Sequence, residues 1–284
     1  METIVMKLAF STNAFKRYSL EDSVREIAKI GYKGVEILCD IPHAYPLVFG
    51  DRQVDSLKST LMSCDIQISN LNAFTLYAIG DVYHPSWIED GRKARIQHTI
   101  DCIMLAKKLG AAHLSTEPGG PVPSPLLLSS ANDAHHHQLE KIFLDGLIKA
   151  AKVAEQENIR LLIEPEPFLL IENSKQFKSF MKNVESDYVR LNFDIGHFYC
   201  VNEDPAKLVY ELSDYIEHFH LADISSNRVH NHLIPGKGAI DFRPVFKAMD
   251  DIGYRGYVTI ELYPYQDDPV QAAKEAHDYL CSIL

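Results

Sequence analysis

The chain has 284 residues, 46% of them hydrophobic, and a formal net charge of −11. This length suits one large α/β domain as well as two smaller domains. The acidic balance and the lack of a Lys/Arg cluster argue against nucleic acid or an anionic membrane as the main partner, because both require a concentrated positive patch.

Five scattered cysteines form no CxxC pair, and they are Cys39, Cys64, Cys102, Cys200 and Cys281. This pattern predicts reduced thiols, neither a disulfide framework nor a zinc–cysteine site. The sequence also lacks a signal-peptide core and an apolar run of membrane-spanning length. We therefore expect a soluble, cytoplasmic protein.

Eight short apolar runs have the length of β-strands and follow one another along the chain. They cover residues 7–11, 34–38, 66–71, 112–116, 160–163, 189–193, 217–221 and 257–260. Strands of a parallel sheet are buried on both faces, so continuous apolar runs are expected in place of alternation.

Helix signals separate these runs. Ser19 and Asp22 form a capping box, and the pairs Asp204-Pro205 and Asp268-Pro269 are typical of helix starts. Helices are predicted between Ser19 and Gly31, over 51–63, 88–109, 134–156 and 174–184, and after Asp204, Asp241 and Asp268. Residues 117–133, rich in proline and glycine, are predicted to form a long loop of the kind that often closes over a site.

Eight strands alternating with eight helices in this length favour a closed (β/α)8 TIM barrel over a doubly wound sheet. No linker interrupts the pattern. We predict a single domain over residues 1–284.

Acidic residues and a histidine lie at the ends of four consecutive strands. Glu164, Asp194 and Glu261 follow the fifth, sixth and eighth runs, and His220 lies on the seventh. In a TIM barrel the C-terminal strand ends converge on one face, where the site is built. Each residue alone would be read as a capped strand end, but together they predict a mononuclear metal site. The oxygen-rich set favours Mn²⁺, Mg²⁺ or Co²⁺, with Zn²⁺ as a further candidate.

Several motifs resemble the xylose isomerase-like TIM barrels, a superfamily that includes sugar and sugar-phosphate isomerases, epimerases and endonuclease IV. They are Ile163-Glu164-Pro165, Asn192-Phe193-Asp194-Ile195-Gly196-His197, His218-Phe219-His220-Leu221-Ala222-Asp223, Pro235-Gly236-Lys237-Gly238-Ala239-Ile240-Asp241 and Thr259-Ile260-Glu261. The resemblance implies that Glu164, Asp194, His220 and Glu261 are the metal ligands. It also implies that His197 faces the substrate and that Arg228 is the family's substrate-binding arginine.

A site of this kind is suited to proton transfer next to a carbonyl group. Glu164 and Glu261, one on each face of the substrate, would remove and return the proton through an enediolate. The leading prediction is a divalent-metal-dependent isomerase or epimerase of a sugar, sugar phosphate or keto-polyol. The alternatives are a dehydratase of the inosose type on the same metal site and a barrel that binds a metabolite without converting it.

The sequence leaves two roles open. Glu166 competes with Glu164 as the metal ligand, although Glu164 matches the strand end better, and either Glu166 or Glu172 is the second active-site carboxylate found in ketose 3-epimerases. His232 is predicted to reach the substrate or a second metal, while the other reading places His230 and His232 in a polar surface loop.

Two segments depart from the endonuclease pattern. Those enzymes need extra histidines, whereas this chain has Asn70-Leu71-Asn72 after the third run and Glu117-Pro118-Gly119 after the fourth. DNA repair is therefore not expected. The predicted partner is a small sugar-like molecule, and a homo-oligomer is compatible with the family.

Overall fold

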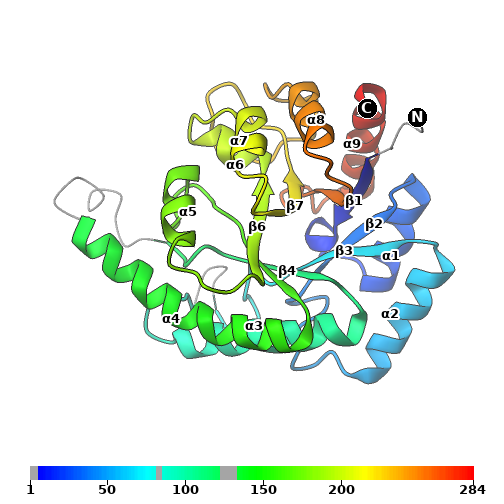
Figure 1. The fold of residues 1–284 in the computed structure, drawn as a ribbon. Helices are drawn as coiled ribbons and strands as arrows, with labels where there is room; N and C mark the ends of the chain where they lie inside the picture. The colour runs from blue at the N-terminus through cyan, green and yellow to red at the C-terminus, as the bar shows by residue number, and fades with distance from the viewer. Residues whose placement is uncertain (1–5, 81–84, 122–132) are drawn as a thin grey trace.

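The computed structural model describes residues 6–80, 85–121 and 133–284. Its centre is a closed barrel of eight parallel strands in sequence order, in which β1 pairs with both β2 and β8 (Figure 1). The strands are β1 (Lys7–Ser11), β2 (Gly34–Leu38), β3 (Gln67–Asn72), β4 (His113–Thr116), β5 (Arg160–Ile163), β6 (Val189–Asp194), β7 (Ile216–Leu221) and β8 (Tyr257–Ile260). The predicted TIM barrel is confirmed.

Helices surround the barrel, and α3 and α4 lie side by side (Figure 1). The α-helices are α1 (Leu20–Ile30), α2 (Asp51–Ser63), α3 (Arg92–Leu109), α4 (Asp133–Glu157), α5 (Ser174–Met181), α6 (Ile195–Cys200), α7 (Pro205–Glu211), α8 (Phe242–Asp251) and α9 (Pro269–Ile283). A short 3-10 helix, η1 (Thr12–Ala14), follows β1.

The prediction of one helix after each strand was wrong between β6 and β7, where α6 and α7 both lie. Helix α6 has six residues, too few to produce an amphipathic pattern in the sequence. It begins directly after β6 because the Asp194 side chain accepts a hydrogen bond from the backbone N–H of His197 at 2.7 Å. This capping turn carries His197 past the end of the strand and into the site.

Helix α3 begins at Arg92, four residues later than predicted. The preceding Gly91 has a φ of +88°, which is incompatible with a continuous helix and explains the late start. Trp87, just before the predicted helix, is fully buried against Phe143, with ring centroids 5.4 Å apart. Helix α5 likewise ends at Met181, before the predicted 184.

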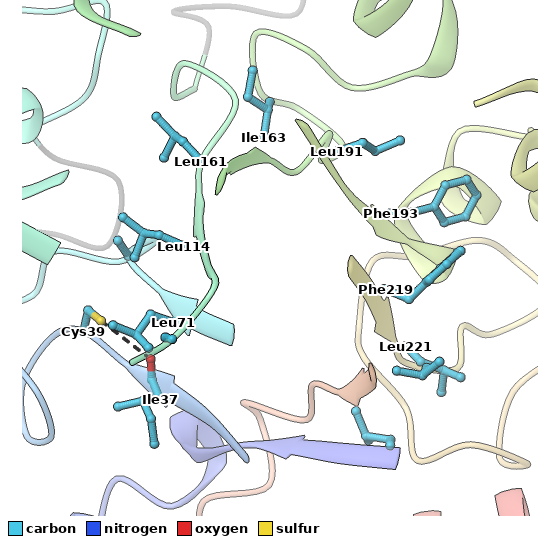
Figure 2. Close-up of a cluster of buried hydrophobic side chains, with 14 of the residues drawn as sticks. Ile37, Cys39, Leu71, Leu114, Leu161, Ile163, Leu191, Phe193, Phe219 and Leu221 are labelled. Carbon is cyan, nitrogen blue, oxygen red and sulfur yellow. Dashed lines mark hydrogen bonds between the residues drawn. The ribbon is translucent and has the colours of Figure 1, made fainter. Parts of the chain in front are cut away.

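Apolar side chains of the strands point outward and fill the space between barrel and helices (Figure 2). Strands β6 and β7 then place polar residues on the inner face, since side chains alternate along a strand. Asn192 and His218, for example, are buried beside the outward-pointing Phe193 and Phe219. The expectation of continuous apolar strands therefore fails for β6 and β7. Their inner polar groups are stable because they bond one another across the barrel.

The part of the chain that the structure describes contains no helix long and apolar enough to cross a bilayer. Most of the predicted long loop, residues 122–132, lies outside the described residues.

Candidate metal and substrate site

The four predicted metal ligands meet at the C-terminal end of the barrel. Glu164 follows β5, Asp194 ends β6, His220 lies in β7 and Glu261 follows β8. Each offers one ligand atom, and these atoms lie within 4.8 Å of one another. All four side chains are buried. The barrel geometry thus brings together residues that are far apart in sequence.

The two glutamates are each fixed by an asparagine. Asn192 Nδ2 donates to Glu164 Oε2 at 2.8 Å, and Asn13 Nδ2 donates to Glu261 Oε1 at 2.7 Å. The other oxygens, Glu164 Oε1 and Glu261 Oε2, lie 3.0 and 3.9 Å from His220 Nδ1. One oxygen of each carboxylate is therefore held in place, while the other faces the ligand group, which is the set Glu164, Asp194, His220 and Glu261.

A further carboxylate, Glu36 of β2, lies behind His220. Its Oε2 is 2.6 Å from His220 Nε2, and both side chains are fully buried. Asn70 Nδ2 donates to the same oxygen at 2.7 Å, and Asn72 Nδ2 donates to Glu36 Oε1 at 3.2 Å. A carboxylate behind a metal-binding histidine fixes the ring and its tautomer, so that the opposite nitrogen faces the ion.

The ligand group carries strongly shifted pKa values. Burial alone would lower the pKa of His220, but Glu164 and Glu36 raise it well above its ordinary value. Burial opposes ionisation of Glu36 as well, yet His220 lowers the pKa of that carboxyl to about 2. Burial and the adjacent carboxylates raise the pKa of Glu261 well above its usual range. Carboxylates this close together repel one another when ionised, so a positive charge at the ligand group would stabilise them.

The residues present fit a divalent metal ion. Within the described structure, the buried Oδ2 of Asp194 has no hydrogen-bond partner, although its Oδ1 caps α6. Unpaired buried carboxylate oxygens are costly unless they coordinate a cation. Three carboxylates and one imidazole form a donor set suited to Mn²⁺, Mg²⁺, Co²⁺ or Zn²⁺.

A cavity of about 250 Å³ opens beside the ligand group. Of the four predicted ligands, only Glu164 and Glu261 line it, whereas Asp194 and His220 lie behind them. The lining residues are Asn13, Lys16, Leu38, Asn72, Phe74, Thr75, Tyr77, Glu164, Glu166, His197, His230, His232, Glu261 and Tyr263. The two predicted catalytic carboxylates are therefore the two that a bound molecule can reach.

Three histidines form another wall of this cavity and a second group that could hold a metal ion. His197 Nδ1 lies 3.0 Å from the carbonyl oxygen of Pro165, and His232 Nδ1 lies 2.9 Å from that of Glu261. Since a carbonyl only accepts, both Nδ1 atoms donate and both Nε2 atoms of the neutral rings keep a lone pair. Burial and the neighbouring His230 lower the pKa of His232 to about 4.

His230 completes this wall. Its Nε2 lies 2.8 Å from His232 Nε2 and its Nδ1 lies 3.7 Å from Glu166 Oε1. Burial and His197 lower the pKa of His230 to about 3. The alternative prediction, which placed His230 and His232 in a polar surface loop, is wrong. Both residues line the cavity, and His232 is 1% exposed.

The remaining candidates occupy different places. Glu166 lines the cavity, whereas Glu172 accepts a hydrogen bond from the backbone N–H of Phe168 outside the set of lining residues. Arg228 also lies outside that set. Its guanidinium stacks 3.9 Å from the ring centroid of Tyr199 and donates to the carbonyl oxygen of the same residue.

Sequence reasoning missed Glu36, Asn13 and Lys16. Glu36 carried a usable signal, because a charged residue within the strand sequence Gly-Val-Glu-Ile-Leu is bound to be buried and paired. Asn13 lies in the short helix η1 and Lys16 lies just after it, and no local pattern predicts the direction of either side chain.

The two segments that depart from the endonuclease pattern have structural partners. Asn70 and Asn72 hold Glu36, and Asn72 also lines the cavity. Glu117 is fully buried, 3.5 Å from Arg95, outside the ligand group. Neither segment supplies a histidine to the site.

Comparison with known proteins agrees with this geometry. An inosose dehydratase of Clostridium perfringens is 25% identical over 285 residues, covering 93% of this chain and 90% of that protein. Among solved structures, a D-tagatose 3-epimerase-like protein superimposes with a TM-score of 0.78 at 22% identity, with 98% of each chain covered. The IOLI protein with a bound zinc atom superimposes with a TM-score of 0.77 at 20% identity, again over 98% of each chain.

These structural likenesses establish the fold, and the sequence relatives are enzymes that act on sugar-like molecules. The family described as xylose isomerase-like TIM barrel matches residues 24–283, nearly the whole chain. With its barrel and its sequence motifs, the chain belongs to the xylose isomerase-like TIM barrel family.

Proposed function

We propose that the protein is a divalent-metal-dependent isomerase or epimerase that moves a proton next to the carbonyl group of a small, sugar-like molecule. One observation carries this proposal. Of the four clustered ligand residues, Glu164 and Glu261 alone line the cavity, so two carboxylates and a bound substrate can meet there.

The metal would be held by Glu164, Asp194, His220 and Glu261. When bound, a divalent ion would polarise the carbonyl and the adjacent hydroxyl of the substrate and so acidify the intervening C–H bond. The identity of the ion is proposed as Mn²⁺, Mg²⁺ or Co²⁺, with Zn²⁺ as a further candidate.

Glu164 and Glu261 would transfer the proton. Because Asn192 and Asn13 each fix one oxygen of a glutamate, both carboxylates are oriented before the substrate arrives. One glutamate, as the carboxylate, removes the proton to leave an enediolate, and the other, which starts as the carboxylic acid, delivers a proton in its place. Return to the opposite face of the same carbon gives epimerisation, and return to the neighbouring carbon gives isomerisation.

His197, His232 and Glu166 would orient the substrate. The Nε2 lone pair of His197 can accept a hydrogen bond from a sugar hydroxyl group, and the Glu166 carboxylate offers further acceptors. The Nε2 atom of His232 accepts from His230 Nε2 at 2.8 Å, so His232 would act by positioning the His230 ring at the cavity wall. Arg228 is retained from the family resemblance as a candidate. It would have to leave its stacked position on Tyr199 to reach the cavity.

A dehydratase is the second candidate, favoured by the relatives named inosose dehydratase. The first step is the same proton removal next to a carbonyl. The carboxylic acid formed then protonates a hydroxyl group one carbon further on, which leaves as water. The two candidates therefore differ in the second step: an isomerase or epimerase protonates carbon, whereas a dehydratase protonates the oxygen of the leaving hydroxyl group.

Incubation of the Mn²⁺-loaded protein with a panel of ketoses, ketose phosphates, inososes and keto-sugar acids in D₂O tests the proposal. Deuterium incorporated beside the carbonyl, with a rearranged sugar as product, is expected for an isomerase or epimerase. A product 18 mass units lighter, as loss of water requires, would instead favour the dehydratase. Absence of both exchange and water loss across the panel would contradict the proposed function.

Variants at the site provide the matched comparison. Glu164→Gln and Glu261→Gln should each lower the exchange rate by about a hundredfold or more. Elemental analysis should find about one divalent ion per chain in the unaltered protein and less in Glu261→Gln. Glu26→Gln is the control, because Glu26 pairs with Lys29 on the surface of α1. Full metal content and activity in Glu261→Gln would refute the assignment.

A further inference from the structure

Among the residues that the structure describes, one cationic side chain lies on the cavity wall. Its lining includes the carboxylates of Glu164, Glu166 and Glu261, while Lys16 is the one lysine or arginine among the lining residues. The Nδ1 donors of two lining histidines, His197 and His232, are already used by backbone carbonyl oxygens. Positive charge provided by the protein at the cavity surface is therefore concentrated at Lys16.

Lys16 is held against the wall by an aromatic ring. Its Nζ lies 4.5 Å from the ring centroid of Tyr77, a cation–π arrangement that fixes the ammonium group beside the cavity. Tyr77 is itself positioned by Asp40, whose Oδ2 accepts hydrogen bonds from the Thr75 hydroxyl at 2.9 Å and the Tyr77 backbone N–H. The ammonium group thus occupies a defined place next to Thr75 and Tyr77.

Among the described residues, the N–H donors of Lys16 find no acceptor. Throughout the described residues, Lys16 makes neither a hydrogen bond nor an ion pair, although Asp40 and Glu261 are close enough to act on its charge. The side chain is only half-buried, and its burial lowers the pKa of the ammonium group. A partly desolvated ammonium group with unused donors gains most from an anion placed against it.

The number of donors indicates which anion fits. A carboxylate carries one negative charge, which one ammonium group can neutralise. A phosphate carries nearly two charges and is typically bound by several cationic or backbone donors, whereas this lining contains no arginine. A neutral hydroxyl group would leave the lysine charge uncompensated. The chemistry of this wall is therefore that of a monoanion.

We propose that Lys16 binds a carboxylate group of the substrate, so that the substrates are polyhydroxy acids bearing an oxo group and not neutral sugars or sugar phosphates. The oxo end lies at Glu164 and Glu261, and the carboxylate lies at the wall formed by Lys16 and Tyr77. This inference rests on the proposed function, because that function assigns the oxo end to the two glutamates.

Three related compounds test the inference by calorimetric titration of the Mn²⁺-loaded full chain. D-tagatose, D-tagaturonate and D-tagatose 6-phosphate differ only at C6, which carries a hydroxyl, a carboxylate or a phosphate. D-tagaturonate should bind about tenfold more tightly than D-tagatose or more, as expected for one charge-assisted hydrogen bond, and should also bind more tightly than the phosphate.

Substitutions at Lys16 identify the group responsible. Lys16→Met should reduce the ratio of the two dissociation constants, D-tagatose over D-tagaturonate, to about one, and Lys16→Arg should preserve part of it. Arg17→Met is the matched control, because the neighbouring Arg17 pairs with Asp267 in solvent and should leave the ratio unaltered. Equal binding of sugar and acid, preference for the phosphate, binding of none of the three, or an unaltered ratio in Lys16→Met would overturn the inference.

Exchange in D₂O separates this inference from the proposed function. Tight, Lys16-dependent binding of D-tagaturonate without exchange or water loss in any compound would retain the carboxylate site and contradict the proposed chemistry. Exchange with D-tagatose at a rate equal to that with D-tagaturonate, with no dependence on Lys16, would support the proposed chemistry and contradict the carboxylate site.

Discussion

The Nε2 atom of His220 lies 2.6 Å from Oε2 of Glu36, and both side chains are fully buried inside the barrel. Hydrogen bonds continue from Glu36 through Asn70 to the Ser115 hydroxyl, which Asn192 also contacts at 3.4 Å. Asn192 then bonds Glu164, which returns to His220. The metal-binding group is thus one side of a closed ring of hydrogen bonds, so its geometry is set before an ion arrives.

Glu36→Gln should lower the affinity for the metal ion. The amide of glutamine would place an N–H₂ group against either Asn72 Nδ2 or His220 Nε2, both of which need an acceptor. Loss of a carboxylate behind a histidine ligand typically weakens metal binding by about 10- to 100-fold. Competition with a coloured chelator measures this change without reference to activity.

Surface variant Glu26→Gln again serves as the control for loss of a carboxylate. An unchanged metal affinity in Glu36→Gln would mean that Glu36 supports the barrel interior and not the ligand group. Urea denaturation of the metal-free protein separates the two roles of Glu36. If Glu36 only supports the barrel interior, Glu36→Gln lowers the free energy of unfolding without changing the metal affinity.

Arg95→Met should destabilise the protein and disturb the cavity wall. Arg95 is fully buried, donates to the carbonyl oxygens of Ala73 and Phe74 at 3.1 and 3.0 Å, and lies 3.5 Å from Glu117. Removing one partner of a buried ion pair typically costs about 3–5 kcal/mol, because the other charge is left uncompensated. Urea denaturation should report a loss of about this size.

The double variant Arg95→Met/Glu117→Gln should be more stable than Arg95→Met alone, since the uncompensated carboxylate is then absent. Burial already raises the pKa of Glu117 to about 7 beside the arginine. A double variant as unstable as the single one would show that the backbone contacts of Arg95, not its charge, matter for stability.

The free energy of unfolding should fall in mild acid, because His98 is buried and resists protonation in the folded protein. Burial, aided by the charge of Arg95, lowers the pKa of His98 to about 3. Above the unfolded-state value of about 6.5, the residue is neutral in both states and contributes no pH dependence. Below that value the unfolded chain binds a proton that the folded chain does not, so stability falls as pH decreases towards about 3, by about 1.4 kcal/mol per pH unit.

His98→Phe removes this proton while keeping a ring of similar shape beside Tyr45. The free energy of unfolding, measured by urea at pH values between about 4 and 6.5, should then depend less steeply on pH. Equal slopes for the two proteins would contradict the assignment, whatever the absolute stability of the variant.

Substrate binding should depend more on His232 than on Arg228. His232 lines the cavity and its Nε2 accepts a hydrogen bond from His230 Nε2 at 2.8 Å, so it positions a second lining ring, whereas Arg228 stacks on Tyr199 outside the lining. With any compound that exchanges in D₂O, His232→Phe should raise KM by about tenfold or more, the effect of losing one buried hydrogen bond. Arg228→Met should raise KM by about twofold or less. The opposite order would support the role that the family resemblance gives to Arg228.

Much of the site was predictable because it depends on topology. Once eight strands alternate with helices, closure of the barrel brings the strand ends together, and Glu164, Asp194, His220 and Glu261 occupy those ends. The strand boundaries themselves follow from local apolar runs and differ from the prediction by about one residue, as is usual for such assignments.

Other features depend on contacts between distant parts of the chain. Helix α6 has too few residues for a periodic signal and begins where the Asp194 side chain caps it. Glu36 and His220 are 184 positions apart, and their contact exists only when β2 and β7 face each other across the barrel. The direction of Lys16 towards Tyr77 likewise depends on how the segments after β1 and β3 pack together.

The sequence by itself therefore determined the barrel, the residues of the candidate metal site and the family, because strand alternation and strand-end chemistry are local properties. The tertiary structure decided which carboxylates face the cavity, which residues support them and where the one cation of the lining lies. Those properties arise from side-chain directions and loop paths, which are set by packing between segments that no local pattern connects.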